Sequence, residues 1–237
     1  MKKAFTLAET LITLGIIGVV AALTIPSLVS KYQKHVYYTQ FRKAATVLEN
    51  AINQYNFDHG CGGQCGSSDS FGGCNNLCLF EAESNNDIFA ADKLGEYMNV
   101  VQWITDDNYE EVCEGYKKRP PAFSYDGTER DVDVPDIHSC KNQVGSIYHK
   151  GYGFITNDGM LFNFATDYAL GNGYVVDING PNKGPNFYGR DMFVFYLFET
   201  ASKRWGYPEE EFDDCFGNNK SGDNCGIRLL QEGKMNY

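Results

Sequence analysis

The sequence is poor in positive charge and in histidine. It contains 20 Lys and Arg residues against 31 Asp and Glu residues, a formal net charge of −11, and only 4 histidines among 237 residues. Nucleic-acid backbones are bound by clustered cations, and the one locally basic run is Lys117-Lys118-Arg119, so we expect no nucleic-acid partner. The histidines match no zinc motif, and neither a Gly-x-Ser-x-Gly elbow nor a phosphate-binding loop occurs, so we predict a protein that is not an enzyme.

Two further absences divide the chain. No charged residue occurs at positions 10–30, and a helix of that length, at about 1.5 Å per residue, crosses a hydrocarbon core of about 30 Å. All 8 cysteines lie from Cys61 onward, and an even number is typical of disulfides in an oxidising compartment. We therefore predict a membrane segment followed by an exported domain.

The residues around the apolar run indicate its orientation. Lys2 and Lys3 precede it, which favours a cytoplasmic amino terminus. The cations after Ser30 weaken that rule, but the cysteines support the same orientation. A signal peptide cleaved near residues 20–22 and a plain membrane anchor are the alternatives. The apolar run continues to Val29 and contains Glu9 at its start, and both features are unusual for a signal peptide.

The first 30 residues resemble a known leader. Lys2-Lys3-Ala4 is followed by Phe5-Thr6-Leu7-Ala8-Glu9 and by a long apolar helix that contains Pro26. This arrangement resembles the prepilin leader that type IV pilins share with the pseudopilins of type II secretion. The resemblance implies that a prepilin peptidase cuts between Ala4 and Phe5, that the new amine of Phe5 is methylated, and that the apolar segment stays on the protein. Ala4 stands where the family usually has Gly.

Glu9 is the acidic residue at the start of this run. A carboxylate costs about 2.5–3.5 kcal/mol at the centre of a bilayer and less near its edge, so a cationic partner is expected. The resemblance implies that this partner is the amine of Phe5 on a neighbouring subunit during filament assembly. The alternative is a Glu9 that lies solvated at headgroup depth. Further along, Pro26 removes one backbone hydrogen bond and is expected to kink or locally melt the helix.

The helical pattern continues into the exported part. Residues 31–57 are amphipathic, and an apolar stripe recurs every three or four residues at Tyr37, Phe41, Ala44, Leu48, Ile52 and Tyr55. We predict that this stripe packs against the protein's own sheet and that one helix runs from Phe5 to about Phe57, ending before Gly60. The resemblance implies the outline of the pilin fold.

The sequence after the long helix predicts an antiparallel sheet of about four strands, at 152–156, 160–165, 173–178 and 191–199. The first two form a hairpin, because Asp158-Gly159 supplies the residues that a tight turn requires. A short helix at 88–98 and short strands at 100–104 and 122–125 occupy the preceding connection. The fold class is therefore α+β, with disulfide-rich loops.

The cysteines are predicted to form disulfides, although eight allow 105 connectivities. We expect Cys61, Cys65, Cys74 and Cys78 to pair among themselves and Cys113 to pair with Cys140. Cys215 would pair with Cys225, which closes a carboxy-terminal loop as in many pilins by resemblance. The alternative for the first four is a zinc site, because their spacing suits metal ligands.

The loop between the last two strands combines Asp177, Asn179 and Asp191 with several Gly and Pro residues. Oxygen-rich loops of this kind bind calcium, but the sequence does not match the EF-hand pattern. Some pseudopilins hold calcium in a carboxy-terminal loop, so the resemblance adds weight to a calcium site. The alternative, which we favour, is a rigid turn in which Asn and Asp bond their own backbone, with no cofactor.

These observations predict an assembly subunit. Residues 1–4 would be a cleaved leader, 5–30 a transmembrane and assembly helix, and 31–237 an extracytoplasmic head. The expected location is a bacterial inner membrane, crossed once, or an extracellular filament, and the expected partners are copies of the chain, other pilins or pseudopilins, and the prepilin peptidase. The sequence does not separate a pilus from a secretion pseudopilus. The alternative is a membrane-anchored extracytoplasmic binding protein that does not polymerise.

Overall fold

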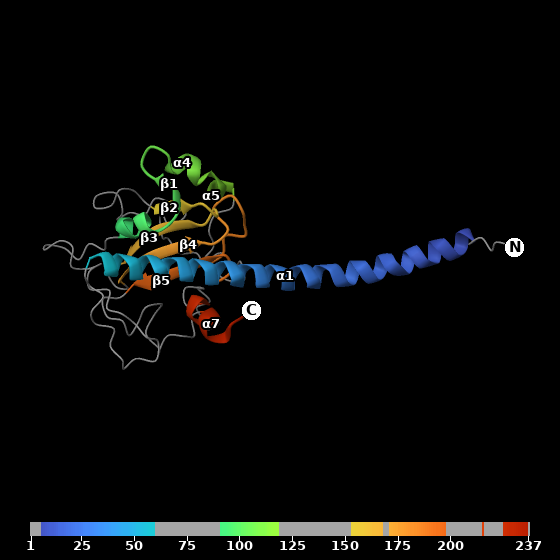
Figure 1. Ribbon diagram of the computed structural model, residues 1–237. Coiled ribbons are helices and arrows are strands. Elements are labelled where there is room, and N and C mark those ends of the chain that lie inside the picture. The colour runs from blue at the N-terminus through green and yellow to red at the C-terminus, as the bar shows by residue number, and fades with distance from the viewer. Residues whose placement is uncertain are drawn as a thin grey trace. The chain divides into compact units, whose positions relative to one another are not determined.

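The computed structural model describes residues 6–59, 91–118, 153–167, 171–197, 215 and 225–236. The chain divides into two compact units, Met1–Val36 and Tyr37–Tyr237. Helix α1 (Leu7–Asp58) contributes to both, and the second unit is α+β (Figure 1). The predicted helix therefore ends one residue beyond the expected position, and Phe5 lies outside the described residues.

Among the described residues, five strands form one antiparallel sheet in the order β1-β2-β3-β4-β5. Their bounds are Val100–Ile104, Gly153–Thr156, Leu161–Asp167, Gly171–Asp177 and Met192–Leu197. The prediction of about four strands is one too few, because β1 joins the edge of the sheet by pairing with β2, where Trp103 lies opposite Phe154. The other strand candidate, 122–125, lies outside the described residues.

Short helices complete the second unit. The predicted helix at 88–98 is present in part, as α3 (Ala91–Leu94) and η1 (Gly95–Tyr97). Helices α4 (Tyr109–Val112), α5 (Glu114–Lys118) and α7 (Cys225–Glu232) were not predicted.

Helix α1 continues through Pro26, so the local melting expected there does not occur. The proline removes one backbone donor, but neighbouring hydroxyls engage the same turns. Thr24 Oγ1 donates to the carbonyl of Val20 at 2.9 Å, and Ser27 Oγ donates to the carbonyl of Thr24 at 3.2 Å. The carbonyl that Pro26 leaves without its helical donor is that of Ala22, four residues earlier, and neither hydroxyl donates to it.

The hairpin between β2 and β3 forms where the sequence predicts it. The amide of Thr156 donates to the carbonyl of Met160 at 3.0 Å, and Gly159 adopts a φ of 83°, which a residue with a Cβ rarely takes. Lys43 Nζ of α1 lies 2.7 Å from Asp158 Oδ2, so an ion pair ties this turn to the helix.

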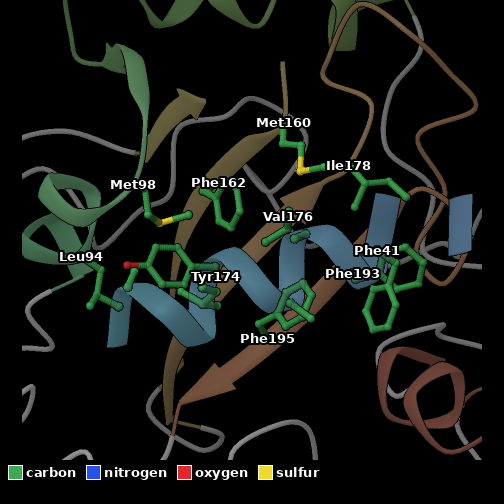
Figure 2. Packing of buried hydrophobic residues seen from close by; sticks show 14 of the residues in the cluster. Phe41, Leu94, Met98, Met160, Phe162, Tyr174, Val176, Ile178, Phe193 and Phe195 are labelled. Carbon is green, nitrogen blue, oxygen red and sulfur yellow. The ribbon is translucent and has the colours of Figure 1, made fainter. Parts of the chain in front are cut away.

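The main core lies between α1 and one face of the sheet (Figure 2). Phe41 is 0% exposed, and its ring centroid lies 4.6 Å from that of Phe193 and 5.6 Å from that of Phe195. Alternate residues of β3, Phe162 and Phe164, face the same core. The predicted apolar stripe is therefore confirmed as the buried face of α1, with Tyr37 at its half-buried edge.

A second, smaller core lies on the other face of the sheet. It joins residues of β3 and β5 to α4, α5 and the loop after β4, and consists of Ile104, Val112, Cys113, Tyr116, Leu161, Tyr188, Met192 and Val194. The period of two along a strand explains the division, because Leu161 and Phe162 point to opposite faces.

Helix α7 is attached to the main core. A disulfide joins Cys215 to Cys225 at its first residue, which is the pairing that the resemblance implied. The backbone of Gly226 approaches Phe41 so closely that a Cβ there would lie 3.3 Å from the ring. Cys113 is also disulfide-bonded. Its expected partner Cys140, and the four cysteines from Cys61 to Cys78 with their zinc alternative, lie outside the described residues.

Candidate functional site

Glu9 forms a capping box with Thr6 at the start of α1. The amide and the hydroxyl of Thr6 donate to Glu9 Oε2 at 2.9 and 2.8 Å, and the amide of Glu9 donates to Thr6 Oγ1 at 3.3 Å. This reciprocal arrangement satisfies amide groups that the first turn of a helix leaves without partners. Sequence reasoning gave Glu9 a cationic partner, or solvent at headgroup depth as the alternative, and missed Thr6, although Thr-x-x-Glu before an apolar run is the signal for such a cap.

The part of α1 that follows this cap is apolar and exposed. Leu11 is 62% exposed and Leu23 75%, and the same holds for the other large apolar side chains between Leu7 and Val29. Among the described residues, α1 is the one helix with a window long and apolar enough to cross a membrane, and none of that window is buried. It is therefore a candidate membrane span.

The predicted calcium residues come together between β4 and β5. Asp177 and Asp191 are both 0% exposed. Asn179 links them, since its amide donates to Asp177 Oδ1 at 3.1 Å and its Nδ2 donates to Asp191 Oδ2 at 3.2 Å. Consecutive antiparallel strands bring their connected ends together, which is why residues 14 positions apart in the chain meet here.

The loop backbone supplies further donors to both carboxyl groups. The amide of Gly180 donates to Asp177 Oδ1 at 2.8 Å. The amides of Asn186 and Phe187 donate to the two oxygens of Asp191 at 2.8 and 2.7 Å. These bonds fix the conformation of the loop.

Tyr116 of α5 completes this group and was not predicted. Its hydroxyl donates to Asp177 Oδ2 at 2.9 Å from a position 61 residues earlier in the chain. The backbone of Gly115 lies so close to Pro181 that a Cβ would come within 1.9 Å of the proline carbonyl oxygen. Together these contacts hold α5 against the loop. We call Tyr116, Asp177, Asn179 and Asp191 the carboxylate clasp.

Burial sets the protonation of the clasp. Desolvation, aided by the charge of Asp191, raises the pKa of Asp177 from 3.8 to about 8. Desolvation also raises the pKa of Asp191, although the amides of Asn186 and Phe187 oppose this effect. Near neutral pH the pair therefore holds a proton on Asp177.

The clasp has the hydrogen bonds of a rigid turn, and the calcium site stays a prediction. Every carboxylate oxygen of the pair accepts a hydrogen bond from an N–H or O–H group, whereas Asn179 Oδ1 is buried and has no hydrogen-bond partner among the described residues. Within the described residues there is no group of three or more Asp, Glu, His or Cys side chains placed to hold a metal. The observed bonds are those of the rigid turn that was the favoured alternative, so we derive no metal chemistry here.

The chain has no match among models of protein families, among curated proteins or among solved structures. The resemblance of residues 1–30 to a prepilin leader therefore stays a prediction.

Proposed function

We propose that this chain is a structural subunit of a type IV pilus-like filament or of a type II secretion pseudopilus, trimmed before Phe5. The observation that carries the proposal is Glu9, an acidic residue capped by Thr6 at the first turn of a long, exposed apolar helix. The leader residues Lys2 to Phe5 add the resemblance to prepilins.

The exposed apolar surface needs a partner. A row of large side chains that includes Leu11, Ile17 and Leu23 cannot remain in water, because each such side chain gains about 1.5–3 kcal/mol on leaving it. Lipid can supply the apolar environment for one copy, and neighbouring helices can supply it for many. A subunit that is stored in a membrane and then assembles uses both environments.

Glu9 is suited to an intermolecular contact. Both bonds from Thr6 reach Oε2, so Oε1 has no donor among the described residues. After trimming, Phe5 would carry a positive amine within one turn of the carboxylate. In a low-dielectric environment a carboxylate and an amine of two different copies attract strongly, so the pair would set the register between subunits.

The head would serve a filament subunit or an anchored protein equally well. Its two cores, its disulfides and its carboxylate clasp stabilise its fold. The alternative function is an anchored extracytoplasmic binding protein, which would use the same helix as a membrane anchor and would not polymerise.

The first experiment is the intact mass and amino-terminal sequence of the protein from its native membrane. We expect a chain that begins at N-methylated Phe5. A chain that begins at Met1 would favour the anchored binding protein, and one that begins after residue 22 would remove the filament proposal.

A pair of substitutions separates the charge of Glu9 from its capping role. Glutamine still accepts the bonds from Thr6, since Gln serves in capping boxes, but it lacks the negative charge. We expect Glu9→Gln to abolish filament assembly as fully as Glu9→Ala, while Thr6→Ala only weakens it. Electron microscopy of sheared filaments provides the readout, and Glu49→Gln in the same helix serves as the control. If Glu9→Gln assembles normally, the charge has no role in assembly.

A further inference from the structure

Three residues with polar ends follow the apolar run of α1 directly. They are Lys31, Tyr32 and Lys34, which we call the collar. As a helix, the charge-free run at 10–30 is about 31 Å long, close to the hydrocarbon thickness of about 30 Å. If the run spans a bilayer, the collar lies within about 6 Å of the hydrocarbon edge, inside a headgroup layer that is about 5–7 Å deep.

The collar side chains are available for a contact outside the chain. Tyr32 is 67% exposed, Lys31 is exposed and Lys34 is partly exposed. In the described ranges the structure gives neither lysine of the collar an ion pair, whereas Lys43 of the same helix pairs with Asp158 at 2.7 Å. The positive charges of the collar therefore need a partner from elsewhere.

Acidic residues are missing from the sequence around the collar. None occurs between Glu9 and Glu49, although 31 acidic residues in 237 would place about five in the 39 positions between them. Near neighbours in the chain therefore do not compensate the two lysines. In a protein of net charge −11, the end of the apolar run is a local positive region.

Membrane insertion does not account for these cations. An excess of Lys and Arg marks the cytoplasmic side of a span, and in the predicted orientation Lys2 and Lys3 supply it. Lys31 and Lys34 lie at the other end and act against this bias. We therefore expect another role for them.

We propose that the collar binds the phosphate groups of anionic phospholipids at the extracytoplasmic face of the membrane. An anionic lipid surface attracts Lys side chains that lie within a Debye length of it. A tyrosine at this depth places its ring against the lipid chains and its hydroxyl among the headgroups. An acidic protein partner would match the charges, but neither the headgroup depth nor the exposed ring of Tyr32.

The inference goes beyond the proposed function, because it holds equally for the anchored binding protein. For a filament subunit it has one consequence. Trimming before Phe5 removes Lys2 and Lys3, so the lysines beside the span then all lie on the extracytoplasmic side. The lipids of that side would hold the trimmed subunit at a fixed depth.

Spin-labelled lipids measure this preference directly. The full chain is reconstituted in phosphatidylcholine vesicles, and electron spin resonance gives the association of labelled phosphatidylglycerol relative to labelled phosphatidylcholine. All variants carry Lys2→Gln and Lys3→Gln, which removes the cations of the opposite end and makes the result independent of trimming. We expect the intact collar to favour phosphatidylglycerol by at least about threefold. Lys31→Gln combined with Lys34→Gln should bring the ratio close to one.

A matched control removes the same charge elsewhere. Lys43→Gln combined with Lys93→Gln also removes two positive charges, but Lys43 pairs with Asp158 and Lys93 lies in α3. We expect this control to keep the lipid preference. High salt should reduce the preference of the intact collar, since its charges are screened. No preference in the intact chain, an unchanged ratio in the collar variant, or an equal loss in the control would overturn the proposal.

A second measurement tests the depth of the collar. Tyr32→Trp introduces an indole at the expected headgroup level, and Leu23→Trp introduces one about 13 Å deeper along the same helix. Lipids brominated near the headgroup should quench the emission from Tyr32→Trp most strongly, and lipids brominated near the chain ends that from Leu23→Trp. The emission of the unsubstituted chain, which contains Trp103 and Trp205, is subtracted. The same quenching profile at both positions, or no quenching of Tyr32→Trp, would overturn the assigned depth.

The failure of this proposal differs from the failure of the proposed function. Filaments from a chain that begins at Phe5 but shows no preference for phosphatidylglycerol would retain the function and reject the collar. A preference that depends on Lys31 and Lys34, in a chain that is neither trimmed nor assembled in its native membrane, would retain the collar and reject the filament.

Discussion

The two parts of α1 contain similar apolar residues in opposite surroundings. In the part before residue 37, Leu23 is 75% exposed, whereas in the part after it Phe41 and Leu48 are completely buried. Both parts are helical, so helix propensity does not distinguish them. The difference lies in what covers them, because the second part packs on the protein's own sheet, whereas the large apolar side chains from Leu7 to Val29 are exposed. A helix can therefore be a core element along one stretch and an unpartnered surface along the next.

The largest expected effect comes from the buried part. Phe41→Ala removes a ring that packs against Phe193 and Phe195, and should lower the free energy of unfolding of the head by about 3–5 kcal/mol. Leu23→Ala should change it by less than about 0.5 kcal/mol, because Leu23 contributes to no described core. Chemical denaturation of the full chain in detergent measures both. Similar losses of unfolding free energy from the two substitutions would contradict the stated difference between the two parts of α1.

The comparison extends to acidic side chains. Glu9 is exposed, whereas Asp177 is buried and its pKa is raised to about 8. Between pH 4 and pH 8 the folded state keeps a proton on Asp177 that the unfolded state has lost, so its contribution to stability falls as pH rises through this range and is constant above it. We expect the head to lose about 4 kcal/mol between pH 5 and pH 9, because about three pKa units of this range lie below the pKa of Asp177.

Asp177→Asn tests this prediction. Asparagine retains an acceptor for the amides of Asn179 and Gly180, and its Nδ2 can donate to the Tyr116 hydroxyl, which in the wild type donates to Asp177 Oδ2, but it does not titrate. The thermal midpoint of this variant should be nearly flat over the same range. Asp158→Asn is the matched control, because Asp158 has its pKa lowered chiefly by Lys43 and Thr156, against the opposing effect of burial. A wild-type midpoint that does not fall toward pH 9 would contradict the assigned protonation.

The smallest expected effect on stability comes from substituting one lysine in each part of α1, Lys31 before residue 37 and Lys43 after it. Lys43 pairs with Asp158 at 2.7 Å but is half-exposed, so Lys43→Ala should cost about 1 kcal/mol or less, and salt should reduce that cost. Lys31, for which the described residues provide no ion pair, should give no measurable loss on substitution by Ala. Denaturation at low and high salt distinguishes the two. A larger loss at Lys31 would mean that the first part also contributes to the head.

Local patterns predicted most of the fold. The stripe from Tyr37 to Tyr55, the turn at Asp158-Gly159 and the last three strands depend on residues that are close in the chain. The number of strands in the sheet was underestimated because β1 pairs with β2 across about 50 residues. No short-range pattern in the sequence indicates such a pairing. Helices α4 and α5 are only one turn long, and α7 begins with Cys225-Gly226, a pair with low helix propensity.

In the candidate sites too, residues that are close in the chain were predicted and distant ones were missed. Asp177, Asn179 and Asp191 were predicted as one group because a single loop carries them. Tyr116 was missed because only the folded chain brings it there. The protonation of Asp177 could not be predicted from the sequence either, because it depends on burial by α5 and by the loop. At Glu9 the sequence contained the complete signal of the capping box, and Thr6 was overlooked.

The sheet has the same order in space as in the chain, and this has a consequence for biosynthesis. Each new strand finds its pairing edge already formed, so a chain that emerges amino terminus first can add β2 to β5 one after another. Helix α7 emerges later than all of them, and its Gly226 covers the ring of Phe41. The ring of Phe41 therefore packs first against Phe193 and Phe195 of β5, and gains the contact with α7 only afterwards.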